Sequence, residues 1–509
     1  MTALLNGFAD VFTAVNLLWI VLGVGTGYVV GVIPGLGKGT ATAVAVPLTF
    51  YLPPIAAIAY LIGISKGSAA GSAVSAILLN APGEPSSAPT AMDGYPLARQ
   101  GKARKALKMG LFASVTGDVI STLLLILLAA PLARVAMLIG PVELTAILVF
   151  SLAFIGSLSG RSALKGIIAG ILGVFVSTIG MEIETAVPRM TFGLLDLWDG
   201  VPLIPMAIGM LALAEMIVQA SDRNTLELER ISLGAADAAN DRISRAEWRQ
   251  SLPAILRGTF IGSAIGILPG LGASVASFIS YGATRRAASD PERFGKGAIE
   301  GVAASESADN AVVPASFVPL FAIGVPGSVI AAIMIGAFMI HGLTPGPRMF
   351  VEQPRLVAAI YASMLVASVA LLAIGWFGQR LFSLIVHVPL RLVLPSVIFF
   401  CCIGAWLQGG GAFGIVVMVV FGLLGVLAKQ LDYSFVTFLI GFVIGPNMEL
   451  SMRQAIAMTN LEPRLFIDHP VATVFLIATI LMVLRFSGVR LRRPRAATAH
   501  PSQRREELK

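Results

Sequence analysis

Continuous apolar runs recur along the whole chain, and they limit the folds that it can adopt. The clearest runs are residues 17–33, 111–132, 146–158, 356–376, 393–406, 415–427 and 471–484. A helix needs about 20 apolar residues to cross the hydrocarbon core of a bilayer, and several runs approach that length. Because the runs do not alternate in polarity, they favour helices over a transmembrane β-barrel. We therefore predict an all-α, polytopic membrane protein with about 10–14 transmembrane or re-entrant segments.

The charge content agrees with a chain that lies mostly in lipid. Only 13% of the 509 residues are charged, whereas a soluble protein carries about a quarter. The formal net charge of +8 resides in short loops between apolar runs, as in membrane proteins whose cytoplasmic loops are basic. We therefore predict contact with the bilayer and no nucleic-acid binding. The adjacent Cys401 and Cys402 cannot form a disulfide framework or a cysteine metal site.

The order of apolar and polar intervals predicts six segments. These are an N-terminal tail (1–16), a first membrane repeat (17–218), a polar cytoplasmic linker (219–257), a second membrane repeat (258–390), C-terminal membrane helices (391–486) and a basic disordered tail (487–509). The first segment contains Asp10 and lacks a basic start, so it is not expected to be a cleavable signal. Arginines near the end of the chain are typical of an anchor at the anionic leaflet. We expect a multi-pass protein of a bacterial inner membrane with a cytoplasmic C-terminus.

A duplicated motif is the strongest signal in the sequence. Gly31-Val-Ile-Pro-Gly-Leu-Gly37 returns as Gly266-Ile-Leu-Pro-Gly-Leu-Gly272, and each copy precedes a second Pro-Gly, at Pro82 and at Pro326. Proline removes a backbone donor and glycine permits left-handed dihedrals, so each Pro-Gly is expected to break a helix. A single Pro-Gly is more often a packing kink. Matched breaks in two halves instead predict a transporter's binding site, because broken backbone at membrane depth must be buried or line a cavity.

The loops between the motifs predict that the two repeats are inverted. Residues 50–54 carry no charge, whereas the equivalent residues 285–296 hold four basic and two acidic side chains. After the second Pro-Gly the bias reverses, because residues 99–108 are strongly basic and residues 345–355 are not. Basic loops face the cytoplasm, so equivalent loops of the two repeats are expected on opposite sides of the membrane.

No catalytic machinery is visible, and we predict that the chain is not an enzyme. Val32 occupies the position where a phosphate-binding loop ending in Gly37-Lys38 requires glycine, and Gly39 follows the lysine. The four histidines, His341, His387, His469 and His500, are scattered, and no His-Glu-x-x-His motif occurs. The alternative is a multi-helix membrane enzyme or a lipid-handling protein that uses the same cavity.

The broken segments supply a predicted site for an organic carboxylate. Unwound backbone exposes amide groups, and the half-helix that follows each break directs the positive end of its dipole at the gap. The predicted substrate-binding residues of the first copy are Pro34, Gly35, Leu36, Gly37, Lys38, Lys66, Asn80, Pro82 and Gly83. Those of the second copy are Pro269, Gly270, Gly272, Ala273, Pro326, Gly327 and Ser328.

Charged residues inside apolar stretches are further candidates. Lys66 is isolated among small residues, and it either serves the site or extends to the membrane interface. Glu306 and Asp309 are three residues apart and share a helix face, where they either bind a cation or cap a broken helix. The predicted Na⁺ ligands are Ser305, Glu306, Asp309 and Asn310. No cofactor, catalytic residue or other metal is predicted beyond Na⁺ or H⁺ as a coupling ion.

Several motifs occur together in a fixed order, and they carry a resemblance. Besides the duplicated motif they are Ala81-Pro-Gly-Glu-Pro-Ser-Ser87, Met92-Asp-Gly-Tyr-Pro-Leu-Ala-Arg-Gln-Gly101, Glu300-Gly-Val-Ala through Asn310, Val325-Pro-Gly-Ser328 and His341-Gly-Leu-Thr-Pro-Gly-Pro347. In these motifs, over most of its length, the chain resembles the large membrane subunit of the tripartite tricarboxylate transporter family.

The resemblance implies a substrate-translocating subunit that takes up citrate or another di- or tricarboxylate. It implies alternating access driven by Na⁺ or H⁺, a periplasmic solute-binding protein that delivers the substrate, and a small membrane subunit of about four helices. Two departures bear on the substrate and the ion. Ile64-Ser-Lys-Gly67 stands where the family has an aromatic-Tyr-Gly element, and Asp309 stands where asparagine is expected.

Overall fold

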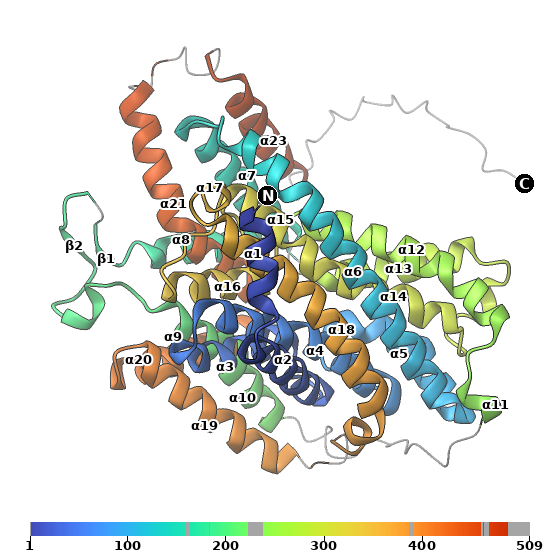
Figure 1. The fold of residues 1–509 in the computed structure, drawn as a ribbon. Helices are drawn as coiled ribbons and strands as arrows, with labels where there is room; N and C mark the ends of the chain where they lie inside the picture. Colours follow the sequence, from blue (N-terminus) through green and yellow to red (C-terminus); the bar gives the residue numbers. More distant parts are fainter. Residues whose placement is uncertain are drawn as a thin grey trace, which may run out of the picture.

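The structure is a computed structural model, and it describes residues 2–158, 162–182, 184–221, 238–385, 388, 390–459, 462 and 468–486. These residues form a bundle of helices (Figure 1). Seven of the described helices are long and apolar enough to cross a membrane, and shorter apolar helices accompany them. The only strands in this part of the chain are β1 (Gly180–Met181) and β2 (Pro188–Arg189), which pair antiparallel. The predicted all-α, polytopic membrane fold is therefore confirmed.

The described residues up to 221 contain ten α-helices. They are α1 (Thr2–Val11), α2 (Ala14–Val32), α3 (Lys38–Ala45), α4 (Pro54–Leu79), α5 (Ala88–Leu97), α6 (Ala103–Ala136), α7 (Pro141–Leu158), α8 (Ala163–Ser177), α9 (Leu203–Ile208) and α10 (Ala214–Ser221). Short 3-10 helices are η1 (Val46–Tyr51), η2 (Pro85–Ser87) and η4 (Leu195–Leu197). The π-helical turns η3 (Ala98–Lys102) and η5 (Gly209–Leu213) join α5 to α6 and α9 to α10.

The second part begins beyond residues 222–237 of the predicted linker, which lie outside the described residues. It contains α11 (Ala238–Asp241), α12 (Arg245–Ile267), α13 (Gly272–Ala287), η7 (Pro291–Arg293), α14 (Ile299–Ala315), α15 (Phe317–Ile323), α16 (Val329–Ile340), α17 (Met349–Glu352) and α18 (Pro354–Ile385). The last helices are α19 (Leu390–Gln408), α20 (Ala412–Gln430), α21 (Phe435–Thr459) and α23 (Pro470–Phe486). The predicted linker boundary at 257 falls inside α12, and the predicted tail 487–509 is outside the described part.

The four Pro-Gly dipeptides of the two matched pairs lie where one helix has ended and the next has not begun. The intervals are residues 33–37, 80–84, 268–271 and 324–328. Left-handed backbone stops two of the preceding helices, at Asn80 (φ 54°) and at Gly324 (φ 74°). Gly35 and Gly270 also have positive φ, of 78° and 86°, which only glycine adopts without strain. The predicted interruption of the helices is confirmed.

Glycines bring the helix before each first break against a second helix of the same copy. On α2, Gly23, Gly27 and Gly31 face backbone carbonyls of α4, and on α12, Gly258, Gly262 and Gly266 face α14. A Cβ atom at Gly27 would lie 2.2 Å from the Ile64 carbonyl oxygen, and one at Gly262 would lie 2.3 Å from that of Ala308. Glycines four residues apart share one helix face, so the two backbones approach closely, as in small-xxx-small packing.

The second breaks are held by equivalent serines, each ten residues before its proline. Ser72 Oγ accepts a hydrogen bond from the amide of Glu84 at 3.1 Å, and Ser316 Oγ is 2.9 Å from Ser328 Oγ. Glu84 and Ser328 occupy the same position after their Pro-Gly. These matched contacts support the duplication, whereas the inverted orientation of the two copies stays a prediction.

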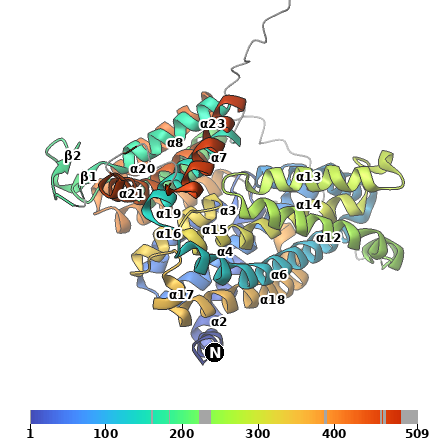
Figure 2. The ribbon, with the colours of Figure 1, turned by 90° about the horizontal axis from the view of Figure 1, so that it is seen from above.

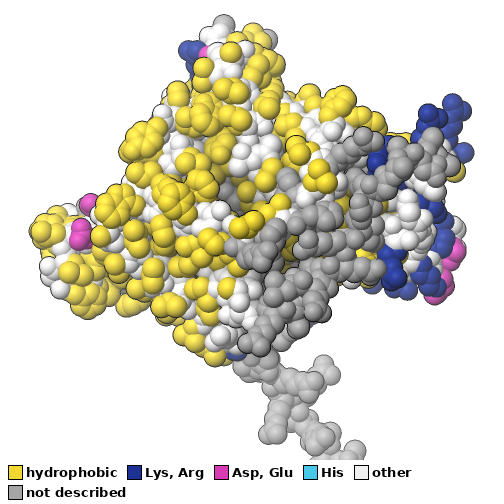
Figure 3. Space-filling model, turned by 90° about the horizontal axis from the view of Figure 1, so that it is seen from below, with side chains coloured by type: hydrophobic (Ala, Val, Ile, Leu, Met, Phe, Trp, Pro, Cys, Tyr) yellow, Lys and Arg dark blue, Asp and Glu magenta, His cyan; other side chains and the backbone are white. Residues whose placement is uncertain are grey.

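The basic loops gather at one end of the molecule. Gln100 Nε2 donates to the carbonyl oxygen of Lys296 at 2.9 Å, which places the loops 99–108 and 285–296 side by side. Lysine and arginine side chains cover this end in the space-filling view (Figure 3). Both loops therefore face the same side, as the charge argument for an inverted arrangement requires.

Candidate functional site

The four broken segments meet at one cavity of about 730 Å³. This volume is in the range of small-molecule sites. Ten of the predicted substrate-binding residues line it: Gly35, Gly37, Lys38, Pro82, Gly83, Gly270, Gly272, Ala273, Gly327 and Ser328. Pro34, Leu36, Asn80, Pro269 and Pro326 belong to the same breaks but do not line the cavity. The breaks, which are far apart in sequence, are thus brought together.

Three helices begin at the cavity wall. The first residues of α3, α13 and α16 all line it, and Ser328 caps α16 by accepting a hydrogen bond from the amide of Ala331 at 3.2 Å. The first amides of a helix have no partner within the helix, and the helix dipole places partial positive charge there. Three such ends that converge on one space favour an anionic ligand.

Lys38 is the first residue of α3 and links the two copies of the motif. Its Nζ lies 2.6 Å from Asp309 Oδ1 on α14 and 3.2 Å from Glu84 Oε1, at the second break of its own copy. The lysine and both carboxylates are largely hidden from solvent, and Asp309 Oδ2 has no hydrogen-bond partner among the described residues. With all three groups ionised, the cluster carries a net charge of −1. The positive charge next to the cavity is therefore already balanced by the protein.

The other predicted cation ligands also lie on α14, and Thr90 is a shared partner of Ser305 and Glu306. Glu306 accepts hydrogen bonds from Thr90 at 2.6 Å and from Ser114 at 3.0 Å. Ser305 Oγ is 2.8 Å from Thr90 Oγ1, and Asn310 Nδ2 donates to the carbonyl oxygen of Glu306 at 3.0 Å. No group of three or more His, Cys, Asp or Glu side chains suited to a metal ion occurs in the described part of the chain. Asp309 alone of this set reaches Lys38.

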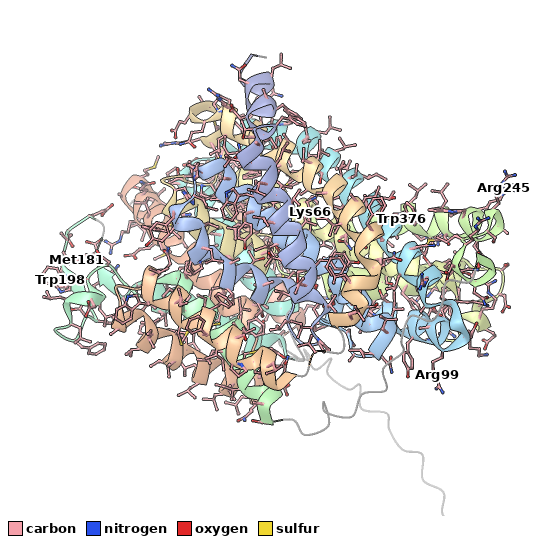
Figure 4. The ribbon with its side chains drawn as sticks, turned by 60° about the horizontal axis from the view of Figure 1, so that its bottom comes forward. Lys66, Arg99, Met181, Trp198, Arg245 and Trp376 are labelled. Carbon is pink, nitrogen blue, oxygen red and sulfur yellow. The ribbon has the colours of Figure 1, made fainter. Side chains whose placement is uncertain are left out.

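Lys66 lies in the interior of the bundle and not at the cavity (Figure 4). Its side chain is 2% exposed, which excludes extension to the membrane interface. Its Nζ donates to the carboxylate of Asp118 on α6 and, at 3.1 Å, to Ser368 Oγ on α18. The structure therefore places this predicted site residue in a buried ion pair that joins three helices. In the sequence, Asp118 is a second isolated charge within an apolar run, and this feature could have indicated it as the partner of Lys66.

The cavity is also lined by residues that were not among those predicted to bind the substrate. Glu84, next to a predicted break, lines it, as do Glu215 of α10, Lys429 of α20, and Ser434 and Phe435 at the start of α21. Lys429 Nζ forms an ion pair with Glu215. The helices after residue 391 thus close one side of the site. No repeated motif marks this part of the sequence, and its position at the cavity was therefore not predicted.

Comparison with known proteins identifies the family. The model of the tripartite tricarboxylate transporter TctA family matches residues 17–440. The chain belongs to this family. In Agrobacterium vitis, the uncharacterised 52.8 kDa protein of the TAR-I ttuC′ 3′ region is 36% identical over 478 residues, 94% of each chain. An uncharacterised protein of the TAR-II ttuC′ 3′ region is 35% identical over 211 residues, 42% of this chain and 87% of the relative. No solved structure matches the chain significantly.

Membership of the TctA family confirms the resemblance carried by the motifs. The chain is the large membrane subunit of a tripartite tricarboxylate transporter. The family model covers both copies of the duplicated motif, α20 and the start of α21, and so every residue that lines the cavity. The cavity formed by the broken segments therefore lies in the part of the chain that the family shares.

Proposed function

We propose that this TctA subunit translocates an organic di- or tricarboxylate, citrate or a relative, across a bacterial inner membrane by secondary-active uptake. One observation carries the proposal: the starts of α3, α13 and α16, together with Lys38, line one cavity at the four helix breaks. A polyanion with several carboxylates suits a space into which several positive dipole ends point. A periplasmic solute-binding protein delivers the substrate, and a small membrane subunit of about four helices accompanies it.

Charge balance in the cavity supports coupling to a cation. With all three groups ionised, the cluster of Lys38, Glu84 and Asp309 has a net charge of −1, and an incoming carboxylate would add more negative charge to a partly dehydrated space. Like charges at short range in a low dielectric repel strongly. Na⁺ or H⁺ at Asp309 or Glu84 removes one negative charge and frees Lys38 for the substrate. Anion binding then depends on the coupling ion, with Ser305, Glu306 and Asn310 as further candidates for holding it.

The position of the cluster supports alternating access by two inverted repeats. Lys38 and Glu84 belong to the first copy of the motif and Asp309 belongs to the second, so the ion pair crosses between the copies. Rocking of one repeat against the other around a central site is the usual mechanism for this architecture. Exchange of Asp309 for a substrate carboxylate at Lys38 would change the contact between the repeats at the moment of binding.

Reconstitution of the complete system in liposomes tests this function. Labelled citrate and a panel of di- and tricarboxylates are offered with either an inward Na⁺ gradient or an inward pH gradient. We expect one gradient to drive accumulation of at least one carboxylate. In Asp309→Asn, gradient-driven accumulation is expected to fall much more than the exchange of labelled for unlabelled carboxylate across the membrane. The exposed Asp290→Asn serves as the control. Accumulation under neither gradient would refute uptake, and full accumulation by Asp309→Asn would refute the coupling role.

A further inference from the structure

A hairpin, defined here as residues 178–182 and 184–201 between α8 and α9, projects from the helical body (Figures 1 and 2). It contains β1, β2 and η4. Met181 and Trp198 of the hairpin lie at one end of the molecule, and Arg99 and Arg245 lie at the opposite end (Figure 4). Because the basic end faces the cytoplasm by the positive-inside rule, the hairpin faces the outer, periplasmic side.

The surface of the hairpin combines apolar and acidic side chains. Phe192 is 84% exposed and Leu195 is 72% exposed, and Leu194 between them is exposed as well. Glu184, Asp196 and Asp199 are exposed beside them, and residues 180–200 contain four acidic side chains against one basic one. Large apolar side chains that stand exposed on a projecting loop mark an interaction surface. The acidic side chains favour a partner with basic groups around an apolar patch.

The hairpin is fixed to α21 by a network of four charges. Arg189 donates to both carboxylate oxygens of Glu449, at 2.6 and 3.2 Å. Arg453 lies 2.9 Å from Glu449 and 3.3 Å from Glu182. A bidentate arginine–carboxylate pair fixes orientation as well as distance. Phe192 itself has a left-handed backbone (φ 51°), a conformation that persists in a bulky residue only where its surroundings hold it.

The helix that holds the hairpin also reaches the cavity. Phe435, the first residue of α21, lines the cavity, and Glu449 lies fourteen residues further along the same helix. At a rise of about 1.5 Å per residue, the two positions are about 21 Å apart along the axis. One continuous helix therefore connects the hairpin anchor with the wall of the substrate site.

We infer that the hairpin is the surface on which the soluble solute-binding protein docks, with an apolar patch edged by basic side chains as its counterpart. The inference rests on the proposed function, because it takes its partner from there. A bilayer is a poorer occupant, since three carboxylates next to the apolar residues would lose hydration at its surface. Docking would transmit force to α21 through Glu449 and Arg453, and α21 would carry the displacement to the cavity wall at Phe435.

Uptake into liposomes as a function of the concentration of added solute-binding protein tests the inference. The test variants are Phe192→Ser/Leu195→Ser and Asp196→Lys/Asp199→Lys. Leu138→Ser, at an 86% exposed apolar position elsewhere, and Asp290→Lys, at the basic end, are matched controls. We expect each test variant to raise the half-saturating concentration about tenfold or more, because truncation of central interface side chains costs this much. Uptake at saturation should be retained. An unchanged half-saturating concentration in the test variants would overturn the inference. An equal fractional loss of uptake at every concentration of solute-binding protein would overturn it as well.

Two further measurements separate docking from its rivals. In the first, binding of the purified solute-binding protein to the detergent-solubilised wild type and variants is measured without transport. Binding that depends on the hairpin in a system that transports no carboxylate would refute the proposed function and keep the docking surface. In the second, Trp198 is kept and the other four tryptophans are replaced by phenylalanine. Quenching of Trp198 by brominated lipids would show that the hairpin inserts into the bilayer and would overturn docking.

Discussion

Replacement of Lys66 by methionine leaves the carboxylate of Asp118 buried without its cation. The lysine and the carboxylate are 2% and 1% exposed, and Ser368 is the remaining hydrogen-bond partner that joins them. Removal of one member of a buried ion pair costs about 3–5 kcal/mol, because the other charge stays dehydrated. Replacement of both members by apolar residues of similar size is about neutral or stabilising. Lys66→Met is therefore expected to be strongly destabilised, and Lys66→Met/Asp118→Leu is expected to recover most of the loss.

The assay is the midpoint of thermal unfolding in detergent, followed by tryptophan fluorescence, for the wild type, both single variants and the double variant. The double-mutant cycle gives the interaction between the two side chains. Because Lys66 does not line the cavity, uptake by the stable double variant should be retained. Equal midpoints for the wild type and Lys66→Met would refute the reasoning about the pair. Loss of uptake in a double variant as stable as the wild type would show that Lys66 acts in transport itself.

Three further predictions follow from the breaks, the glycine contacts and the hairpin. Gly27→Ala should destabilise the protein by about 1–3 kcal/mol through overpacking against Ile64, whereas Gly25→Ala on the same helix meets no atom within 4 Å and should be tolerated in the same unfolding assay. Pro82→Ala and Pro326→Ala should abolish uptake without preventing membrane insertion, and unaltered uptake in both would count against the role of the breaks. Hydrogen bonds from the hydroxyl and amide of Thr185 lower the pKa of Glu182 from its ordinary 4.5. The contribution of Glu182 to the hairpin anchor is therefore complete above pH 4.5 and is lost as the pH falls through the lowered pKa. Proteolysis within the hairpin should rise only in that acidic range. In Thr185→Val, which lacks the hydroxyl, the rise should begin at a higher pH.

The sequence predicted the breaks because their cause is local. Proline at 34, 82, 269 and 326 removes an amide, and left-handed backbone at Gly35, Asn80, Gly270 and Gly324 turns the chain, so no distant contact is needed to end the helices. The convergence of the breaks could be anticipated from their duplication, since unwound backbone in a membrane must be buried or line a cavity. The contribution of Phe435 and Lys429 could not, because it depends on how α20 and α21 pack against α10, and no motif records that packing.

Charged residues show where local reasoning ends. Lys66 and Lys38 are both isolated lysines in apolar surroundings, and the sequence placed both in the substrate site. The structure separates them, because Asp118 approaches Lys66 from α6 while Asp309 and Glu84 meet Lys38 at the cavity. Which carboxylate reaches which lysine is decided by helix packing over long sequence distances. The hairpin surface could not be predicted for a related reason, since the exposure of Phe192 and Leu195 is a property of the folded surface.

Protection of a cysteine in the cavity tests the central claim most directly. Ser274, which lines the cavity near the start of α13, is changed to cysteine after Cys401 and Cys402 have been replaced by serine, and the purified protein is labelled with a hydrophilic thiol reagent. A carboxylate that the system transports, added with its coupling ion at ten times its Kd, should slow labelling about tenfold, because only the unliganded fraction reacts. Asp290→Cys at the exposed basic end should label at the same rate with and without substrate. Labelling of Ser274→Cys that the transported carboxylate does not slow would contradict the placement of the substrate among the four broken helices.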